Sequence, residues 1–314
     1  MTSSLPKQPL LLFIPSLFLL LLLLSSLALG SPTRGGGGRP ARLTYHRGSL
    51  LSGNVKLTLV WYGPFGRVQK NVIRSFIQSL NYRGLRGAYM EPQVSAWWRI
   101  VESYQPRRRG VVTPITVKVV RQITDKNYSV GKVLTVDFIP GLIQKATAGD
   151  KGTIAVVFAA RGVTVQGLCM GNCSQHGVLG RQPYILVGDP ETECPGTCAW
   201  PFYPSDYGPK GVTLQPPSGN VGADAMVVSF ATALAATVTN PYDDGFYGGS
   251  LFERTEAGTA CPHMFGSGAF PGYTGKVRVD PATGGAFNAR GFKGRKFLLP
   301  AVWNPITSSC WTPL

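Results

Sequence analysis

The chain has 314 residues, of which 44% are hydrophobic and 11% aromatic. This composition suffices for a large packed core and excludes a chain that is disordered along most of its length. Lys and Arg number 31 against 15 Asp and Glu, which gives a net charge of +16. So basic a protein concentrates near polyanions, which leaves nucleic acid, anionic membrane and acidic polysaccharide as candidate partners.

Residues 1–30 have the features of a cleaved signal peptide. An apolar run extends from Leu10 to Leu24, and Ala28 and Gly30 stand at the two positions that a signal peptidase recognises. We therefore expect cleavage near Ser31 and a secreted protein without a stable membrane anchor. The alternative is that the Leu-rich run is retained and anchors the protein in a membrane. Secretion removes nucleic acid from the candidate partners and permits disulfides.

Residues 31–42 are predicted to form a flexible Gly/Pro/Arg linker, and residues 43–314 a single domain. Predicted strands and helices alternate along the first part of this domain. The strands are Val55–Tyr62, Ile115–Ile123, Gly152–Val165 and Tyr184–Val187, and the helices are Val68–Leu80, Val94–Tyr104 and Val136–Ala146. Such alternation predicts an α/β fold with a mixed, largely parallel sheet and helices on its faces.

The stretch from Val221 to Pro241 is predicted to be one buried central helix. Its residues are apolar on all sides, it carries no ionisable side chain after Asp224, and Asn220 or Asp224 could cap its start. A helix of this kind offers no metal ligands of its own. After Pro241 the chain is rich in Gly and aromatic residues and has only short strand candidates, at 276–280 and 296–299. We expect this region to be long and irregular and to wrap the same core.

The six cysteines are predicted to form three disulfides. Two close pairs stand about twenty residues apart, and two single cysteines follow in the C-terminal region; they are Cys169, Cys173, Cys194, Cys198, Cys261 and Cys310. The close pairs with His176 nearby could also form a zinc site, but an even number of cysteines in a secreted chain favours disulfides. Six cysteines allow 15 pairings. Our expectation is that the first four pair among themselves and the last two with each other, which would tie down the C-terminal region.

Two N-glycosylation sequons begin at Asn127 and Asn172. Asn127 lies in a polar stretch and is expected to be modified. Asn172 stands next to Cys173, and a neighbouring disulfide would hinder its modification.

The sequence contains no recognisable catalytic motif. It has three His and no Gly-x-Ser-x-Gly, and its cysteines are assigned to disulfides. Asp189 with Glu191, or Asp243 with Asp244, could in principle hydrolyse a glycoside, but acids in Pro/Gly loops more often form turns. We therefore predict no catalytic residue, no cofactor and no metal, and expect the protein not to be an enzyme. The alternative is a hydrolase with an unrecognised site, which in the compartment considered below would act on wall polymers.

Aromatic residues near Gly and Pro are candidates for stacking on sugar rings, with neighbouring Lys or Arg binding acidic sugars. The alternative is that their rings pack in the core or under long loops. The candidates are Trp200, Phe202, Tyr203, Tyr247 and Tyr273.

Several stretches together resemble the plant EXORDIUM, or phosphate-induced protein, family. The resemblance covers nearly everything from Leu43 to the C-terminus. Its most specific parts are CPGTCAWPF at 194–202 and GRKFLLPA at 294–301. The other parts are Leu43–Gly53 with Trp61–Gly63, Val94–Trp98, Asn220–Met226 with Thr239–Pro241, and Ala257–Gly275.

The resemblance implies an extracellular protein of the plant cell wall, or apoplast, linked to growth responses, brassinosteroid signalling and nutrient status. It implies no established biochemical activity. Its partners would be acidic wall polysaccharide or a wall or receptor protein, and its oligomeric state is open. Some relatives resemble zinc proteases in carrying His-Glu where this chain has Thr232 and Ala233. By that analogy alone the fold would be a zinc-protease-like scaffold, degenerate in this chain.

Overall fold

The computed structural model describes residues 42–83, 92–106, 110, 112–205, 213–250, 254–270 and 273–314. These residues belong to one compact unit, Pro40–Leu314. The predicted signal peptide and all of the predicted linker except Arg42 lie outside the described residues.

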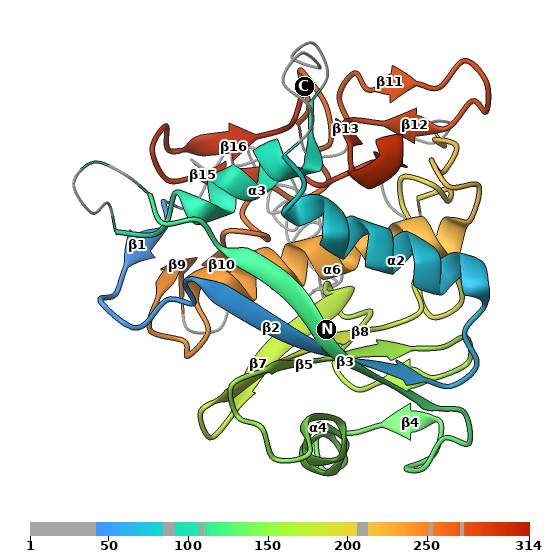
Figure 1. Cartoon of the computed structure of the whole chain (residues 1–314). Coiled ribbons are helices and arrows are strands. Elements are labelled where there is room, and N and C mark those ends of the chain that lie inside the picture. The colour runs from blue at the N-terminus through green and yellow to red at the C-terminus, as the bar shows by residue number, and fades with distance from the viewer. Residues whose placement is uncertain are drawn as a thin grey trace, which may run out of the picture. The chain divides into compact units, whose positions relative to one another are not determined.

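A five-stranded sheet forms the base of the domain (Figure 1). Its strands, in spatial order, are β3 (Thr116–Asp125), β2 (Asn54–Tyr62), β5 (Ile154–Ala159), β8 (Gln182–Val187) and β7 (Ser174–Leu179). The first four run parallel, and β7 is antiparallel to β8 at the edge. All six residues of β5 are buried, as expected for a central parallel strand covered on both faces. The predicted mixed, largely parallel sheet is confirmed, although β7 itself was not predicted.

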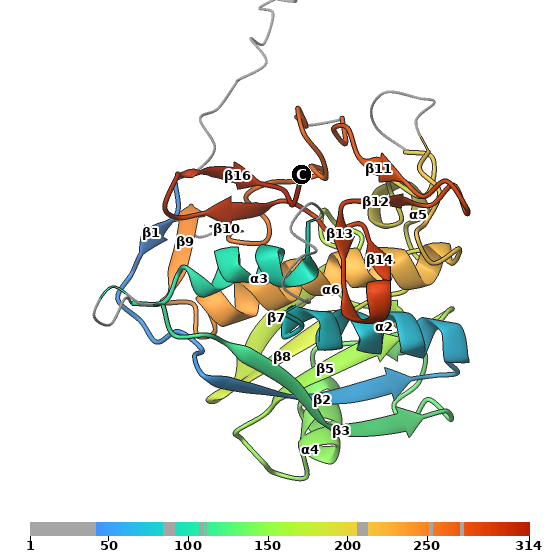
Figure 2. The same ribbon diagram turned by 45° about the horizontal axis from the view of Figure 1, so that its top comes forward.

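Helices cover both faces of this sheet. One face carries α2 (Arg67–Leu80), α3 (Val94–Glu102) and α6 (Val221–Thr239), and the other carries α4 (Ile139–Thr147) (Figures 1 and 2). Each predicted helix is present, with its ends shifted by a few residues. The apolar stripe of α2 is buried against the core and its opposite side faces solvent. That exposed side becomes one wall of the site described below.

Helix α6 is the central helix that the sequence predicts. Most of its residues are buried, and the Asn220 side chain accepts a hydrogen bond of 2.8 Å from the Ala223 amide, which caps its start. Among the described residues it alone is long and apolar enough to cross a membrane, but 83% of the apolar window lies buried inside the domain. This burial is typical of a core helix.

The region after α6 lies over the helices, on the side away from the sheet (Figure 2). It consists of short strands paired two or three at a time: β9 (Phe246–Gly249), β10 (Arg254–Glu256), β11 (Arg278–Val279), β12 (Ala286–Phe287), β13 (Ala289–Arg290), β14 (Lys296–Phe297), β15 (Val302–Asn304) and β16 (Ser309–Trp311), with the short helix η1 (Phe292–Gly294). Strand β1 (Thr44–Tyr45) joins β9 and β10, and β4 (Val133–Leu134) pairs with β6 (Thr164–Val165). The predicted irregular, disulfide-tied C-terminal region is confirmed.

Three disulfides join all six cysteines. Cys169 bonds Cys194, Cys173 bonds Cys198, and Cys261 bonds Cys310. The expected grouping is therefore confirmed, and the structure adds the pairing within the first four. The first two bridges connect the segment before β7 to α5 (Pro195–Cys198). The third closes the C-terminal region upon itself.

Candidate functional site: a basic cleft between helix α2 and the η1 turn

A cleft of about 700 Å³ separates the exposed side of α2 from the turn around η1. It is formed by residues more than two hundred positions apart in the chain. Its lining residues are Val68, Asn71, Ser75, Gln78, Pro217, Ser218, Asp280, Phe292, Lys293, Gly294, Arg295 and Lys296. The second wall includes the start of GRKFLLPA, one of the two most specific family stretches.

The α2 wall presents uncharged polar groups to the cleft. Asn71, Ser75 and Gln78 recur every three or four residues, so they lie along one side of the helix, opposite its buried stripe. With Val68 they span roughly 15 Å of helix, at about 1.5 Å of rise per residue. Amide and hydroxyl groups at such spacing can form hydrogen bonds with successive hydroxyls of an extended ligand.

The opposite wall is a tight turn fastened to α2. Lys293 and Gly294 both adopt positive φ, at 56° and 73°, which reverses the chain. The Phe292 amide donates a hydrogen bond of 2.8 Å to the Ser79 hydroxyl. A Cβ at Gly291 would lie 2.1 Å from that same hydroxyl, so only glycine allows the turn to approach the helix so closely. The two walls are thus held together by direct contact.

Positive charge dominates the second wall. Lys296 forms an ion pair with Asp280. The hydrogen bond that Lys296 donates within this pair is the main reason that the pKa of Asp280 is lowered. Lys293 is exposed, and its ammonium lies 5.5 Å from the centre of the Phe292 ring. Arg295 is half-buried. Among the described residues Asp280 pairs with Lys296, and neither Lys293 nor Arg295 forms an ion pair with it. Lys293 and Arg295 therefore leave a net positive charge on this wall.

A buried carboxylate lies behind the cleft. Asp224, in the first turn of α6, is 3% exposed, and its Oδ2 accepts hydrogen bonds from the Ser218 amide at 2.8 Å and hydroxyl at 2.7 Å. Burial raises the pKa of Asp224 to about 6, while the two Ser218 hydrogen bonds and the positive charge of Arg295 act in the opposite direction. Because Ser218 and Arg295 both line the cleft, the protonation state of Asp224 affects the charge felt there.

The five aromatic candidates are dispersed, and within the described chain none of them lines this cleft. Trp200 packs edge-on against His263, and Phe202 is 4% exposed in a small core cluster. Tyr203 is 42% exposed. The Tyr247 ring is covered by His46, with ring centres 3.6 Å apart, and by the Arg254 guanidinium at 4.6 Å; Tyr273 pairs with the exposed ring of Phe270. Tyr203 is thus the most exposed ring among the five candidates, and Tyr273 lies beside the exposed ring of Phe270.

Both sequon asparagines are exposed. Asn127 lies in the turn after β3, where the Ser129 hydroxyl donates a hydrogen bond to Asp125. Asn172 lies in the turn between two bridged cysteines, and its carbonyl accepts a hydrogen bond of 2.8 Å from the Cys169 amide.

A polar cluster that the sequence does not predict lies at the C-terminal end of α6. His176 Nε2 and Glu256 Oε2 are 2.8 Å apart, and the Asn240 amide donates a hydrogen bond of 2.5 Å to the other oxygen of Glu256. His176 Nδ1 is buried and has no hydrogen-bond partner in the described part of the protein. The cluster joins β7, β10 and the end of α6, so no local sequence pattern could have indicated it. Titratable side chains on β7 and β10 therefore lie at the end of the central helix, although the helix itself carries none there.

Asp189 and Asp243, two of the acidic residues considered for glycoside hydrolysis, have structural roles. Asp189 accepts hydrogen bonds from the amides of Glu191 at 3.0 Å and Thr192 at 3.2 Å, as a turn-forming aspartate does. Asp243 forms an ion pair with Arg254. On α6, the half-buried Thr232 donates its hydroxyl to the Val228 carbonyl at 3.1 Å.

Comparison with known proteins identifies relatives along almost the whole domain. The family profile described as "Phosphate-induced protein 1 conserved region" matches residues 43–313. Protein EXORDIUM-like 2 of Arabidopsis thaliana is 43% identical over 282 residues, covering 87% of this chain and 90% of its own length. Protein EXORDIUM of the same plant is also 43% identical, over 86% and 88%. Protein PHOSPHATE-INDUCED 1 of Nicotiana tabacum is 39% identical, again over 86% and 88%. No solved structure matches.

Proposed function

The chain belongs to the plant family of EXORDIUM-like and phosphate-induced proteins, and on that premise we propose that it is a secreted, non-enzymatic protein of the cell wall that binds acidic polysaccharide. The signal-peptide features of residues 1–30 support export to the apoplast. The family resemblance supports a part in growth regulation linked to brassinosteroid and nutrient status. Glycosylation at Asn127 is part of the same proposal, because that residue is exposed.

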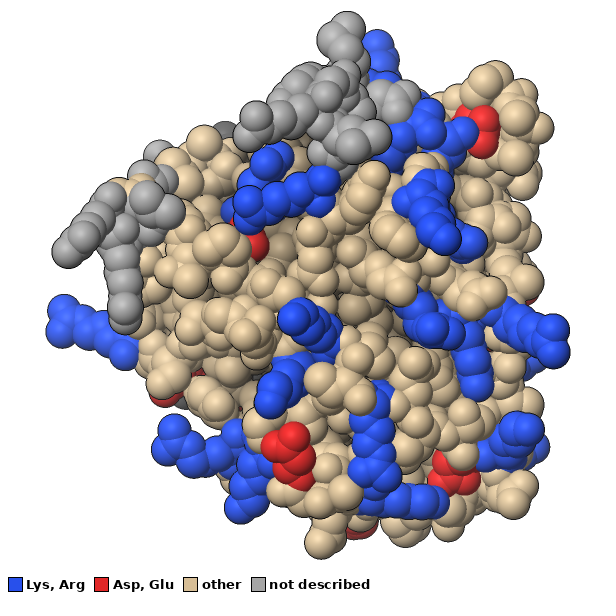
Figure 3. Space-filling view, viewed as in Figure 1, with Lys and Arg blue, Asp and Glu red and all other residues tan. Residues whose placement is uncertain are grey.

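The cleft is the observation that carries the binding proposal. A chain of uronic acids offers a carboxylate and several hydroxyls on each sugar. The wall formed by Lys293 and Arg295 supplies cations for carboxylates, and the α2 wall supplies amides and a hydroxyl for sugar hydroxyls. The face that contains this cleft carries many Lys and Arg side chains and few acidic ones (Figure 3). Such a surface attracts a polyanion over the screening distance of about 10 Å at 0.1 M salt.

The test is the binding of polygalacturonate to the mature protein at low salt. Lys293→Gln/Arg295→Gln should raise the dissociation constant about tenfold, because each lost cation contributes roughly 0.7 kcal/mol at an exposed site. A matched control, Lys118→Gln/Arg121→Gln, removes two exposed cations from the edge strand β3, outside the cleft. Equal weakening by both pairs would show that net charge alone accounts for binding, and retention of a fully methyl-esterified polymer would contradict the role of the carboxylate.

A hydrolase is the second candidate, and one observation favours it. Glu256 holds His176 through Nε2, and the buried Nδ1 of that imidazole is unpartnered among the described residues. A carboxylate that orients an imidazole is the pairing found in general bases, which act only where the second nitrogen reaches the substrate. A screen of wall polysaccharides and peptides with the wild-type protein and His176→Gln separates the two candidates. Turnover by the wild type that His176→Gln abolishes would establish the hydrolase. If the wild type turns over none of these substrates, the hydrolase proposal fails and the binding proposal stands.

A further inference from the structure

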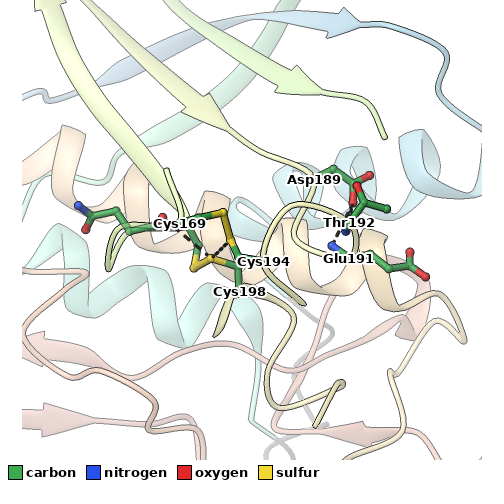
Figure 4. The surroundings of a disulfide bond; sticks show 8 residues. Cys169, Asp189, Glu191, Thr192, Cys194 and Cys198 are labelled. Atoms are coloured by element: carbon green, nitrogen blue, oxygen red, sulfur yellow. Dashed lines mark hydrogen bonds between the residues drawn. A yellow bond between two sulfur atoms is a disulfide. The ribbon is translucent and has the colours of Figure 1, made fainter. Parts of the chain in front are cut away.

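Two disulfides lie in direct contact between β7 and α5. The Cys169–Cys194 and Cys173–Cys198 bridges bring the Sγ atoms of Cys194 and Cys198 to 3.2 Å from each other, although these two atoms belong to different bridges. The Sγ atoms of Cys169, Cys194 and Cys198 all lie within 4.8 Å of one another. Figure 4 shows this cluster beside the Asp189 turn.

A small cavity gives access to these sulfurs. Its volume is about 110 Å³, and all four cysteines contribute to its lining. Val165 and Leu168 form an apolar part of the wall, and Asp189 and Glu193 are the acidic residues of the lining. Cys198 is buried, Cys173 and Cys194 are half-buried, and Cys169 is exposed. A thiol head group is small enough to enter such a space, where it meets two bridges instead of one.

We propose that this two-bridge cluster is a thiol–disulfide exchange site that accepts small thiols, with a preference for those carrying positive charge. Exchange proceeds by attack of a thiolate on a disulfide sulfur. An incoming thiolate RS⁻ bonds to Cys169 Sγ, and the Cys169–Cys194 bond breaks to release the Cys194 thiolate. That thiolate already lies 3.2 Å from Cys198 Sγ.

The second and third steps rearrange the cluster without net oxidation or reduction. The Cys194 thiolate attacks Cys198 Sγ, forms a Cys194–Cys198 bond and releases the Cys173 thiolate. Cys173 then attacks Cys169 of the mixed disulfide, forms a Cys169–Cys173 bond and expels RS⁻. Two disulfides are present before and after, so the thiol acts as a catalyst. Shortening a 3.2 Å contact to a bond of about 2.05 Å requires a movement of roughly 1 Å.

The charge preference follows from the cavity wall. Glu193 is half-buried and places a carboxylate beside the sulfurs, in a site where a charge is less screened than in bulk water. Asp189 adds a second carboxyl, although burial raises its pKa and so reduces its ionisation. A cationic thiol is attracted to this wall and an anionic thiol is repelled.

The sequence provides a direct readout of the rearrangement. Trypsin cuts after Arg161, Arg181 and Lys210, so one peptide contains both Cys169 and Cys173 and the next contains both Cys194 and Cys198. With the observed pairing the two peptides are joined by two bridges. After rearrangement each peptide is closed internally and the two separate. Mass spectrometry of the alkylated, digested protein distinguishes the two forms.

The experiment treats the mature, oxidised protein with cysteamine, 2-mercaptoethanol or 2-mercaptoethanesulfonate at equal thiolate concentrations. We expect separated peptides with no gain in alkylated cysteine, formed about tenfold faster with cysteamine than with the sulfonate, since tenfold corresponds to 1.4 kcal/mol. The Cys261–Cys310 bridge serves as internal control in the same digest. Recovery of the joined peptides alone, or rearrangement only when the protein unfolds, would overturn the proposal.

Two carboxylate variants sharpen the test without altering a cysteine. Glu193→Gln should bring the rates with cationic and anionic thiols close together. Glu191→Gln, an exposed residue that does not line the cavity, should leave their ratio unchanged. Equal ratios in the wild type and both variants would remove Glu193 from the mechanism. In Cys173→Ser/Cys198→Ser, the Cys194 thiolate has no second bridge to attack, so the mixed disulfide at Cys169 should accumulate. Failure to detect this mixed disulfide would count against attack at Cys169 Sγ.

Discussion

The sheet with its central helix and the region after Pro241 are both well packed, but different interactions hold them. In β5 and α6 the backbone groups bond within regular ladders, and the side chains need only be apolar and fit together. Strands of two or three residues are too short to pair all their backbone groups in such ladders. In the C-terminal region single side chains complete the backbone hydrogen bonds, so a polar residue there has a structural role that no apolar residue can replace.

Asn288 illustrates this second mode of stabilisation. Its side chain is fully buried and donates to the carbonyls of Phe265 and Leu299, each at 2.7 Å, while its oxygen accepts from the Leu299 amide at 2.8 Å. Trp97 and Tyr104 act similarly from α3 and its C-terminal end, donating to the carbonyls of Pro300 and Trp303. The Asn288 bonds hold the C-terminal region together, and the Trp97 and Tyr104 bonds attach it to the helices beneath it. The comparison therefore predicts that polar losses in one region cost more than apolar changes in the other.

The largest effect is expected for Asn288→Leu, which keeps the size of the side chain and removes all three hydrogen bonds. Three backbone groups would be left buried and unpaired, at about 1–3 kcal/mol each, so the free energy of unfolding should fall by roughly 5 kcal/mol. Urea unfolding followed by tryptophan fluorescence measures this change. A loss below 2 kcal/mol would mean that water or a shift of the backbone restores the bonds.

The second prediction concerns the bridge that closes the C-terminal region. Cys261 and Cys310 are 49 residues apart in sequence, and releasing a loop of that length should cost about 4 kcal/mol through the entropy of the unfolded chain. Cys261→Ala/Cys310→Ala tests this by thermal unfolding. If the variant unfolds at the wild-type temperature, the side-chain hydrogen bonds alone hold the region, and the comparison needs to be revised.

The third prediction addresses the boundary between the two regions, where Asp224 of α6 meets Ser218 and lies near Arg295. The folded-state pKa of Asp224, about 6, exceeds the value near 3.9 of an unfolded Asp. Its protonated form is therefore favoured by folding, and this contribution is fully present below pH 3.9 and is lost as the pH rises through 6. The loss is roughly 3 kcal/mol. In Asp224→Asn this part of the pH dependence should disappear, which denaturant titrations at pH 4 and pH 7 can measure.

The smallest effect is expected for Phe230→Leu in α6. Phe230 packs edge-on against Phe76 and Phe158, with ring centres 5.9 and 5.3 Å apart, and is fully buried. The smaller apolar side chain loses two ring contacts and some packing but leaves no polar group without a partner, so the cost should be only about 1–2 kcal/mol. The same urea assay places it beside Asn288→Leu. The comparison would fail if the two substitutions destabilised the protein equally.

The cleft lies where the two regions meet. One wall is the solvent side of α2, and the other is the η1 turn of the C-terminal region, fastened by the Phe292–Ser79 hydrogen bond. Its shape therefore depends on both modes of stabilisation. Substitutions that remove hydrogen bonds or the disulfide of the C-terminal region should therefore weaken polygalacturonate binding even where the sheet remains folded.

The regular part of this protein and its family could be predicted from the amino-acid sequence. The 3.6-residue pattern of α2, the uniformly apolar α6 and the buried run of β5 each repeat over enough residues to predict an element, and the grouping of the cysteines predicted which could pair. These patterns are local, because burial imposes a period on any long helix or strand. Strand β7 was missed because its half-buried SQHGVL has no such period.

The short strands and both polar sites depend on how distant segments pack together. A strand of two residues has no period. The sequence therefore predicted β11 and β14 only as the longer candidates 276–280 and 296–299, and it did not predict β12 and β13. The cleft joins Asn71 to Arg295, and the polar cluster joins His176 to Glu256. Neither contact produces a recognisable pattern in the sequence around these residues, because both depend on how the whole chain packs. The sequence could identify cationic, polar and aromatic residues as candidates for binding sugars, but only packing determined which of them face the same space.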